Sequence, residues 1–365
     1  MATWNIVFTG FFLGSLLLCF LLTFVVKRLA RLLNILDHPS SRKIHTAPIP
    51  LLGGVAIFAA FFLTIVMARM LVNVPLVPQI VHDYLSGIYK VNWKLSAILG
   101  GGVLVVAFGL MDDVIGLQAW QKLVLQIVIA TLLFASGVRI TLFISSFWFS
   151  YLVTLLWMTA LMNSFNLLDN MDGLSAGVAF ICGALLLVLA VRAEQFFVAT
   201  ILAVFLGSVG GFLLHNLPPA GIFMGECGSS FLGYFLGVIS ILLTFYRYGD
   251  FHSFLPLVTP LVIFAVPFFD TISVVWIRHR RGLPLFHGDK NHLSHRLVSI
   301  GMTHRQAVVF IYLVTLCTGV GALFLPSLTL RGSALVILQT LMILAIVGLL
   351  EAEGRRKNGQ SEGGA

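Results

Sequence analysis

The chain has 365 residues, of which 59% are hydrophobic and only 10% charged, and its mean hydropathy is +1.02. Soluble domains carry about 25% charged residues, so this chain could not cover a soluble surface with polar side chains. The net charge of +8 does not indicate a nucleic-acid partner, because basic residues in a membrane protein first report topology. The four cysteines are scattered without a C-x-x-C pair, which indicates neither a disulfide framework nor a zinc site.

Apolar runs divide the chain into about eleven predicted membrane spans. A helix needs roughly 20 residues to cross the hydrocarbon core, and runs of this kind predict an all-α polytopic membrane protein. The runs lie near 5–26, 51–71, 95–111, 121–137, 147–163, 176–192, 196–214, 230–246, 255–277, 306–325 and 333–350.

The sequence also predicts the character of the first apolar run and of the last fifteen residues. The first run is followed at once by Lys27, Arg28 and Arg31, with no positive residue before it and no A-x-A cleavage site after it. It is therefore predicted to be a membrane anchor and not a cleaved signal peptide. Residues 1–350 are expected to form a single transmembrane domain, and the polar, Gly-rich residues 351–365 a disordered cytoplasmic tail.

The basic residues predict the orientation of the spans. If the loop after the first span is cytoplasmic, fifteen of the twenty-two Lys and Arg residues lie on that side: Lys27, Arg28, Arg31, Arg42, Lys43, Lys122, Arg278, Arg280, Arg281, Lys290, Arg296, Arg305, Arg355, Arg356 and Lys357. The other seven are Arg69, Lys90, Lys94, Arg139, Arg192, Arg247 and Arg331. This asymmetry predicts an external N-terminus and a cytoplasmic C-terminus in a multi-pass cell-membrane protein.

The acidic residues gather on the same side. With this topology, only Asp83, Glu194 and Asp250 of the fourteen acids fall outside. The positive-inside rule says little about acids and so does not explain this bias. A shared site at the cytoplasmic face would explain it.

Asp112 and Asp113 end the third predicted span. Adjacent carboxylates at a membrane surface repel each other unless they share a cation or a proton. Oxygen-only ligands of this kind suit a hard divalent ion, Mg²⁺ or Mn²⁺. A solvated helix end is the alternative interpretation of this pair.

Asn166, Asp169 and Asp172 follow in the next cytoplasmic loop, three residues apart. One helical turn would place them on a common face. Three polar groups aligned between hydrophobic spans are costly unless they bind something, although a hydrated turn with capping aspartates is the alternative. No Glu follows at the twelfth position of an EF-hand loop, so a calcium loop is rejected.

Two further loops carry candidate ligand contacts. Around Glu226, several glycines would let backbone N–H groups approach a ligand, although a Gly-rich membrane turn would look the same. The loop at about 278–305 is rich in Arg and His, and its His292-x-x-His295-Arg296 core could bind phosphates or a metal. Without a Cys or the Glu of H-E-x-x-H, this core is not a zinc-protease motif.

Taken together, these segments resemble one family, the polyprenyl-phosphate N-acetylhexosamine-1-phosphate transferases, and within it the WecA/TagO-like branch more than the MraY branch. The MraY branch would show three consecutive histidines in the last loop. The resemblance covers roughly residues 35–305 and is carried by Asp37-His38-Pro39, Arg42-Lys43-x-His45, Gly53-Gly54, Asp112-Asp113, the Asn166/Asp169/Asp172 loop, Met224-Gly225-Glu226-x-Gly228-Ser229 and Asp289-Lys290-Asn291-His292-Leu293-Ser294-His295-Arg296. Two positions depart from the family pattern. Glu226 stands where the family usually has Asp, and Ser294 where the WecA-like branch often has His.

The resemblance implies an enzyme that transfers N-acetylhexosamine-1-phosphate, expected to be N-acetylglucosamine-1-phosphate, from a UDP-sugar to undecaprenyl or another polyprenyl phosphate. UMP would leave, Mg²⁺ or Mn²⁺ would serve as cofactor, and the product would begin synthesis of a cell-envelope polysaccharide. A divalent ion neutralises the charge that gathers when one phosphate attacks another. Nucleic acid is not an expected partner, membrane lipid is, and a homodimer stays open.

The resemblance also implies residue roles. Asp112, Asp113, Asp169 and Asp172 are the expected catalytic residues, and Asp113, Asp172 and Glu226 the expected metal ligands. Expected substrate contacts are Lys43, His45, Lys122, Asn166, Asn216, His292, His295 and Arg296.

Two other classes of function are considered. A cation- or proton-coupled transporter would show inverted repeats and acids near the membrane midplane, whereas this sequence shows no internal repeat and its acids lie at span ends. A noncatalytic membrane scaffold would have the same spans without the chemistry.

Overall fold

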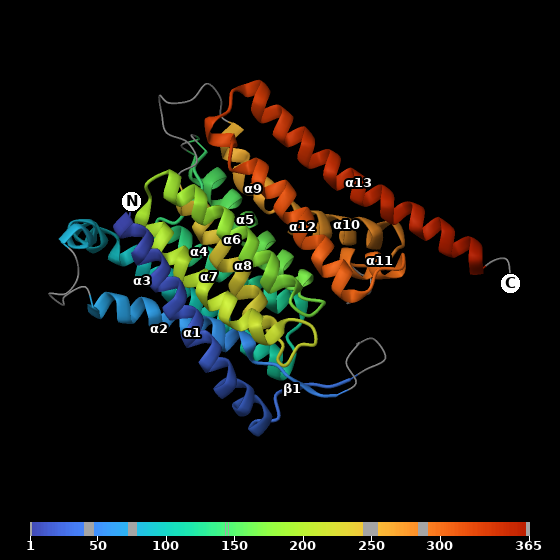
Figure 1. The fold of residues 1–365 in the computed structure, drawn as a ribbon, viewed down its shortest axis with the longest axis horizontal. Helices are drawn as coiled ribbons and strands as arrows, with labels where there is room; N and C mark the ends of the chain where they lie inside the picture. Colours follow the sequence, from blue (N-terminus) through green and yellow to red (C-terminus); the bar gives the residue numbers. More distant parts are fainter. Residues whose placement is uncertain are drawn as a thin grey trace.

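The computed structural model describes residues 2–39, 47–71, 79–142, 144, 146–243, 255–283 and 291–362. Within these residues the chain is almost entirely helical (Figure 1). The helices are α1 (Ala2–Leu32), α2 (Gly53–Leu71), α3 (Gln79–Ile115), α4 (Ala119–Ala135), α5 (Phe147–Leu168), α6 (Leu174–Arg192), α7 (Phe196–Asn216), α8 (Gly225–Leu242), α9 (Thr259–Ile263), α10 (Ala265–Arg280), α11 (Leu293–Ser299), α12 (His304–Ala322) and α13 (Leu330–Glu362). Two 3₁₀ turns, η1 (Leu255–Val258) and η2 (Leu325–Ser327), and two short strands, β1 (Leu36–Asp37) and β2 (Ile49–Pro50), complete the described elements.

Nine of the described helices are long and apolar enough to cross a membrane, so the all-α polytopic class is confirmed. The expected count of eleven is not confirmed. The run at 121–137 forms α4, which has only 17 residues. The run at 255–277 is divided among η1, α9 and α10, with a break at Phe264. Proline lacks a backbone donor, and Pro260 and Pro267 on either side of the break weaken a continuous helix there.

The disordered tail expected at 351–365 stays a prediction, and the structure describes a helical backbone for residues 351–362. The backbone of α13 remains helical through Glu362, past the end of its apolar run at residue 350. Glu, Ala, Arg and Lys, which are frequent between 351 and 357, are good helix formers and allow the helix to continue. α13 lies along the outer edge of the bundle and extends past it (Figure 1).

α8 is the most buried of the nine candidate spans and packs against α2, α3, α5 and α6. Close approach at its N-terminus depends on small residues. A Cβ atom added to Gly54 would lie 2.1 Å from the backbone nitrogen of Gly228, and one added to Gly109 would lie 2.3 Å from the Cα of Cys227. These contacts bring α2 and α3 against the first turn of α8, next to Asp113.

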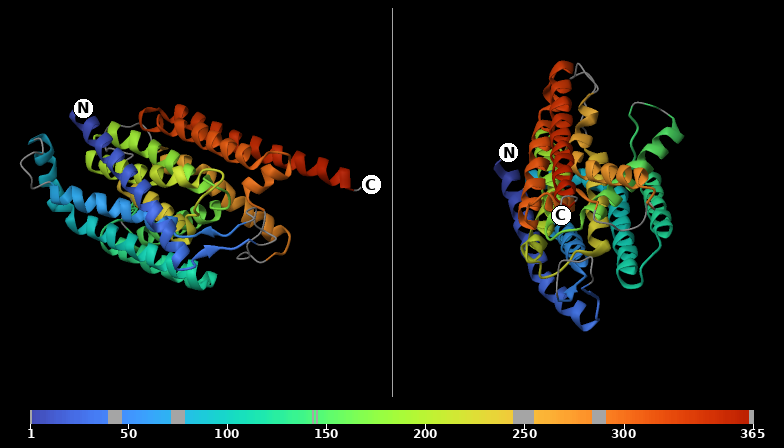
Figure 2. Two further views of the ribbon diagram at one scale, coloured as in Figure 1. Left: turned by 60° about the horizontal axis from the view of Figure 1, so that its bottom comes forward. Right: turned by 90° about the vertical axis from the view of Figure 1, so that its right-hand side faces the viewer.

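One end of the bundle is built by loops that hydrogen-bond to one another. β1 pairs antiparallel with β2, and the two strands leave the helices beside the end of α1 (Figures 1 and 2). Phe223 donates its backbone N–H to the carbonyl of Pro50, and Gly53 donates to the carbonyl of Phe223. The strand pair is thereby fixed to the loop that precedes α8.

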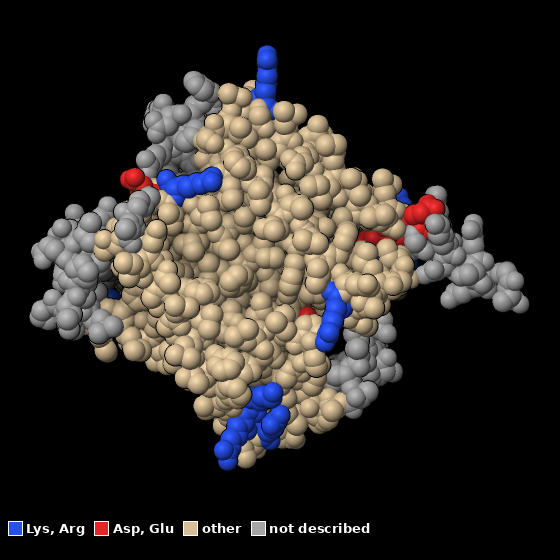
Figure 3. All heavy atoms as spheres, in the orientation of Figure 1, with Lys and Arg blue, Asp and Glu red and all other residues tan. Residues whose placement is uncertain are grey.

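The outer surface is largely apolar. In Figure 3, most of the visible face is formed by residues other than Lys, Arg, Asp and Glu, and most of the charged side chains in view lie toward its margins. Large hydrophobic side chains of α1, α12 and α13 are exposed over about half of their surface, among them Leu17, Leu21, Leu313 and Leu338. Such a belt suits contact with lipid, where backbone polar groups must be satisfied within helices.

Candidate active site

A cavity of about 840 Å³ opens at the loop-built end of the bundle. Six carboxylates line it, together with three other titratable side chains, His295, His304 and Arg305. The carboxylates come from β1, α3, the α5–α6 turn and α8: Asp37, Asp112, Asp113, Asp169, Asp172 and Glu226. Sequence segments far apart therefore converge on one acidic pocket, as the distribution of acids along the chain predicts.

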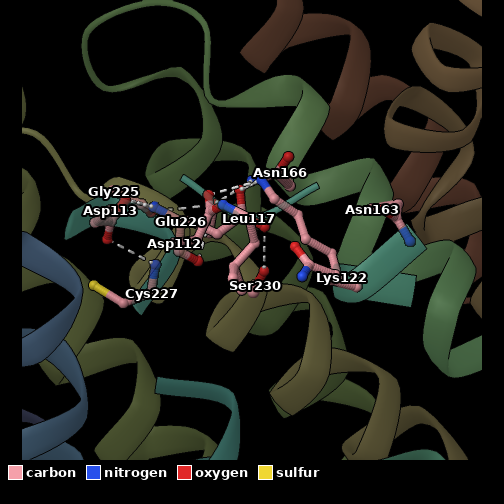
Figure 4. Close-up of polar contacts among 12 residues, drawn as sticks. Asp112, Asp113, Leu117, Lys122, Asn163, Asn166, Gly225, Glu226, Cys227 and Ser230 are labelled. Carbon is pink, nitrogen blue, oxygen red and sulfur yellow. Dashed lines mark hydrogen bonds and ion pairs between the residues drawn. The ribbon is translucent and has the colours of Figure 1, made fainter. Parts of the chain in front are cut away.

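Lys122 on α4 bridges two of these carboxylates, Asp112 and Glu226. Its Nζ donates to Oδ2 of Asp112 at 2.7 Å and to Oε2 of Glu226 at 3.1 Å (Figure 4). Asp112 also accepts the backbone N–H of Leu117 on its other oxygen, at 2.6 Å. Lys122 is thus held beside two carboxylates, and its ammonium offsets part of their negative charge.

Asp113 points to a different partner from its neighbour Asp112. Its Oδ1 accepts the backbone N–H of Glu226 at 2.7 Å, and its Oδ2 accepts that of Cys227 at 3.2 Å. These are free N–H groups at the start of α8, so the carboxylate satisfies the helix N-terminus and interacts favourably with its dipole. Gly225 has φ +74, and a Cβ there would lie 2.5 Å from Asp113 Oδ2. Successive residues of a helix face different directions, so the two aspartates do not bind one common protein group.

Glu226 is the most heavily engaged carboxylate of the cluster. Oε2 accepts Nδ2 of Asn166 at 2.5 Å in addition to the Lys122 ammonium, and Oε1 accepts the Ser230 hydroxyl at 3.1 Å. Asn166 also donates to Ser229 Oγ at 3.1 Å, which ties the end of α5 to the first turns of α8.

Asn166, Asp169 and Asp172 all line the cavity, although not as one helical face. The prediction of a shared helical turn is wrong because α5 ends at Leu168, Asp169 is its C-cap, and Gly173 adopts φ +75 before α6 begins. The chain instead turns around the pocket. Asp172 Oδ2 accepts the backbone N–H of Ala220 at 2.9 Å, which fixes this turn to the α7–α8 loop.

Asp169 lies in the most negative part of the pocket. Burial, followed by the charges of Asp113, Glu226 and Asp172, raises the pKa of Asp169 from 3.8 to about 8. Like charges and loss of hydration both disfavour the ionised form. A carboxyl group with such a pKa is a candidate for proton exchange near neutral pH or for stabilisation by a cation.

Asn216, an expected substrate contact, is occupied by protein groups at both ends of its amide. Its Oδ1 accepts the Gly173 N–H at 3.0 Å, and its Nδ2 donates to the Ile222 carbonyl at 2.9 Å. It is 3% exposed, and it joins the α5–α6 turn to the α7–α8 loop. Its position indicates that it shapes the pocket.

Of the three expected residues in the His292-x-x-His295-Arg296 core, only His295 lines the cavity. His292 is buried, and its Nδ1 lies 2.9 Å from Oδ2 of Asp270 on α10. The other oxygen of Asp270 accepts the Leu293 N–H at 2.6 Å, at the start of α11. Arg296 is also buried and contacts protein groups. His292 and Arg296 are one turn apart and share the face of α11 that packs inward.

Two features of the site are not predicted from the sequence. Asp270 received no role, although a lone acid within a predicted span is a signal for function or for a buried partner. His304 and Arg305 were noted only as part of a basic loop, yet both line the cavity, where Arg305 donates to the Pro218 carbonyl at 3.0 Å. Lys43 and His45, expected to contact phosphate, lie outside the described residues.

The resemblance implies Mg²⁺ as the cofactor, and the residues that line the pocket can be compared with the ligands that this ion requires. No three His, Cys, Asp or Glu side chains in the described part of the chain converge on one point in this arrangement. The chemistry of the lining nevertheless fits, because carboxylate oxygens are the ligands that hard divalent ions prefer. The charge fits too, since burial and then the neighbouring carboxylates raise the pKa of Asp169 from 3.8 to about 8, and a cation would relieve the repulsion among these carboxylates.

Comparisons with known proteins identify the family of the chain. Residues 95–244, from α3 to the end of α8, match the family described as glycosyl transferase family 4. A probable undecaprenyl-phosphate N-acetylglucosaminyl 1-phosphate transferase of Bacillus subtilis is 33% identical to the chain, over 92% of the chain and 90% of that protein. A decaprenyl-phosphate N-acetylglucosaminephosphotransferase of Mycobacterium leprae is 28% identical over 95% of the chain and 90% of that protein. An undecaprenyl-phosphate alpha-N-acetylglucosaminyl 1-phosphate transferase of Escherichia coli K12 is 28% identical over 83% and 80%. With an acidic pocket at one end of a hydrophobic helical bundle and relatives matched over nearly their whole length, the chain belongs to the polyprenyl-phosphate N-acetylglucosamine-1-phosphate transferase family.

Proposed function

We propose that this protein transfers N-acetylglucosamine-1-phosphate from UDP-N-acetylglucosamine to a polyprenyl phosphate and releases UMP. The observation that carries the proposal is the polar cavity at the end of an apolar bundle, which six carboxylates line and where two of them, Asp112 and Glu226, bind Lys122. A lipid phosphate must react at the edge of the membrane, and a soluble nucleotide sugar reaches it only from water. The relatives named for undecaprenyl and decaprenyl phosphate support this acceptor class.

The reaction forms one phosphorus–oxygen bond and breaks another. An oxygen of the acceptor phosphate attacks the β-phosphorus of the donor, and the bridging oxygen leaves with the α-phosphate as UMP. Asp112 and Lys122 are the pair for the acceptor phosphate: the ammonium binds it, and the Asp112 carboxylate takes its proton when it enters protonated. Asp113 has both oxygens on the backbone of α8 and holds Glu226 in place.

The donor occupies the other side of the pocket in this proposal. Asn166, Asp169 and Asp172 face it from the α5–α6 turn, and His295 and Arg305 face it from α11 and α12. The guanidinium of Arg305 supplies positive charge beside the phosphates, which an otherwise acidic lining would repel. These residues orient the diphosphate for in-line displacement.

Mg²⁺ belongs to the proposal, with Mn²⁺ as a substitute. Asp113, Asp172 and Glu226 are the residues that would hold it, and when bound it would neutralise the negative charge of the two reacting phosphates. The carboxylate-rich lining supports this assignment.

The pocket faces the cytoplasm and the protein resides in the plasma membrane in this proposal. The support is the excess of Lys and Arg in the loops on the same predicted side of the membrane as the acids. Single-cysteine variants at positions 42 and 287, labelled with an impermeant thiol reagent in intact cells, test the orientation. Labelling from outside would reverse it.

Transfer is tested with purified protein in vesicles that contain undecaprenyl phosphate. Radiolabelled UDP-N-acetylglucosamine and Mg²⁺ are added, and the expected result is label in the lipid fraction with an equal amount of UMP released. The Asp112→Asn variant is the matched inactive control. A panel of UDP-N-acetylglucosamine and UDP-N-acetylgalactosamine decides the sugar. Absence of lipid-linked label from the folded wild-type protein with either donor would refute the proposal, and uptake of donor without product would favour a transporter.

A further inference from the structure

α13 carries a buried carboxylate, Glu351, just past its apolar run. It is 6% exposed, although the residues before it, Leu349 and Leu350, are open to the surroundings. Oε2 of Glu351 lies 3.0 Å from Nε of Arg296 on α11, which is itself 3% exposed. A charged side chain is rarely buried in this way unless it has a partner. Solubility therefore does not explain a carboxylate at this position.

Before this point α13 borders an apolar groove of about 600 Å³. The groove lies between residues 337–344 of α13 and the helices α5 and α10, and α13 contributes Leu341 and Leu344 to its lining. Closer to Glu351, Val347 is buried and packs in the core. The helix also runs at the outer edge of the bundle, as Figure 1 shows. The pair of Glu351 and Arg296 adds a specific, charged contact to this apolar packing, one turn beyond Val347.

The guanidinium of Arg296 is a junction of three segments. Its Nη1 donates to the Asn291 carbonyl at 2.9 Å, just before α11, and its Nη2 donates to Ser273 Oγ on α10 at 2.8 Å. The third nitrogen, Nε, faces Glu351. With its planar group used in this way, Arg296 fixes α11 relative to α10 and α13.

α11 is the element that presents His295 to the cavity. Its N-terminus is held by Asp270 through His292 and the backbone of Leu293, and Ser294 donates a short hydrogen bond to Asn170 in the α5–α6 turn. These contacts hold the first turn. The second turn packs in the core through Leu297, which is fully buried, and the guanidinium of Arg296 adds the polar contacts on its side of the helix.

We propose that Glu351 is a positioning residue for the transferase: by binding Arg296 it fixes α11, and so the place of His295 in the donor side of the pocket. This proposal rests on the proposed function for its kinetic consequence. It assigns to α13, beyond its apolar span, a direct part in the geometry of the active site.

Loss of the Glu351 charge would leave the Arg296 guanidinium buried without its anionic partner. Such a group either turns toward water or draws water in, and both responses move the segment that carries it. A small displacement of a substrate-contacting side chain costs as much as about 100-fold in rate, because reacting groups must be aligned closely. The effect falls on binding and alignment of the donor, since His295 lies on that side.

The test compares Glu351→Gln with Glu353→Gln, a matched control on an exposed residue of the same helix. For each variant, kcat and the KM for each substrate are measured in vesicles, together with thermal unfolding and hydrogen exchange in peptides covering 291–299. We expect Glu351→Gln to raise the KM for UDP-N-acetylglucosamine about 10-fold or more, with faster exchange in 291–299. The KM for polyprenyl phosphate should change little, and Glu353→Gln should behave as wild type. Arg296→Lys, which keeps the charge but loses the planar contacts, should show the same pattern.

Two results would overturn the proposal. One is wild-type KM values and wild-type exchange in 291–299 for Glu351→Gln. The other is a lower unfolding temperature with unchanged KM values and unchanged exchange, which would make the pair a contributor to stability alone. Hydrogen exchange needs no turnover, so an inactive wild-type protein would refute the proposed function while the link between Glu351 and α11 is still decided.

Discussion

Replacing Glu226 by Gln tests the centre of the proposed site, because this carboxylate connects α8 to α4 and α5. The substitution keeps the size of the side chain and removes its charge. Oε2 of Glu226 accepts from the ammonium of Lys122 at 3.1 Å and from the amide of Asn166 at 2.5 Å. An amide oxygen can replace one acceptor, but the new NH₂ group cannot accept from Ser230, whose hydroxyl lies 3.1 Å from Oε1.

The size of the effect follows from these contacts. A hydrogen bond that involves a charged group contributes about 1.5–3 kcal/mol, and Oε2 receives one from Lys122. If this interaction is needed in the transition state, its loss corresponds to about 10- to 100-fold in kcat/KM, at about 1.4 kcal/mol for each factor of ten. Loss of a ligand to a divalent ion adds to this, so we expect a fall of at least about 100-fold for Glu226→Gln.

Glu226→Asp gives the graded comparison, and Asp is the residue that the family usually has at this position. The charge is retained, but the carboxylate withdraws by one carbon–carbon bond, about 1.5 Å. It then no longer reaches Lys122 and Asn166 in the present arrangement, so we expect activity between that of wild type and Gln, with a higher Mg²⁺ requirement.

The assay is transfer to undecaprenyl phosphate as a function of Mg²⁺ concentration for wild type, Glu226→Asp and Glu226→Gln. Thermal unfolding of each protein in detergent is the control for folding, because the backbone N–H of residue 226 still binds Asp113 in both variants. Wild-type turnover with an unchanged Mg²⁺ requirement in Glu226→Gln would show that Glu226 neither binds the ion nor supports the transition state.

Three further predictions use the same preparations. Asp112→Asn should lower kcat about 100-fold or more with an unchanged unfolding temperature. Asp113→Asn should lower kcat and also lose about 1 kcal/mol of stability, because the Asp113 carboxylate caps α8. Equal unfolding temperatures for the two variants would contradict this distinction. The pKa of Asp169 is raised from 3.8 to about 8, so the folded protein binds a proton that the unfolded chain has lost in this range, and the stability of the metal-free protein should fall as pH rises toward 8. Asp169→Asn should remove this fall in stability. In the wild-type protein, Mg²⁺ affinity should rise over the same pH interval. A pH dependence of unfolding in the variant that is identical to that of wild type would refute the assignment. Arg305→Gln should raise the KM for the UDP-sugar more than that for the lipid acceptor, and unchanged KM values would remove Arg305 from the donor site.

Much of the fold could be predicted from the sequence because lipid imposes a strong pattern on it. The apolar runs at 147–163, 176–192 and 196–214 coincide closely with α5, α6 and α7. A run of apolar residues does not, however, show whether its helix is continuous. The segment 255–277 is broken because of local backbone requirements around Phe264, which hydropathy does not report.

The candidate site was predictable to the level of which segments meet, but not to the level of side-chain partners. Asp112, Asp113, Asp169 and Asp172 were predicted to share a site, and all four line one cavity. That Asp113 caps α8 depends on the close approach of Gly109 to Cys227, a tertiary contact between residues more than a hundred positions apart. Spacing along the chain carries no information about such a contact.

The basic loop at about 278–305 also shows that sequence spacing does not identify the partners of a side chain. His292 and Arg296 have the composition of a phosphate-binding motif, yet their side chains are directed toward Asp270 and Glu351 inside the protein. In a chain with only 10% charged residues, each buried charge needs a partner, and the partner is as informative as the charge itself. A basic residue near an acidic pocket therefore has two competing uses, contact with the anionic substrate or support of the backbone that carries the contact. The lining of the cavity distinguishes these two uses. His295 and Arg305 line the pocket, whereas His292 and Arg296, each within one helical turn of His295, hold it in place.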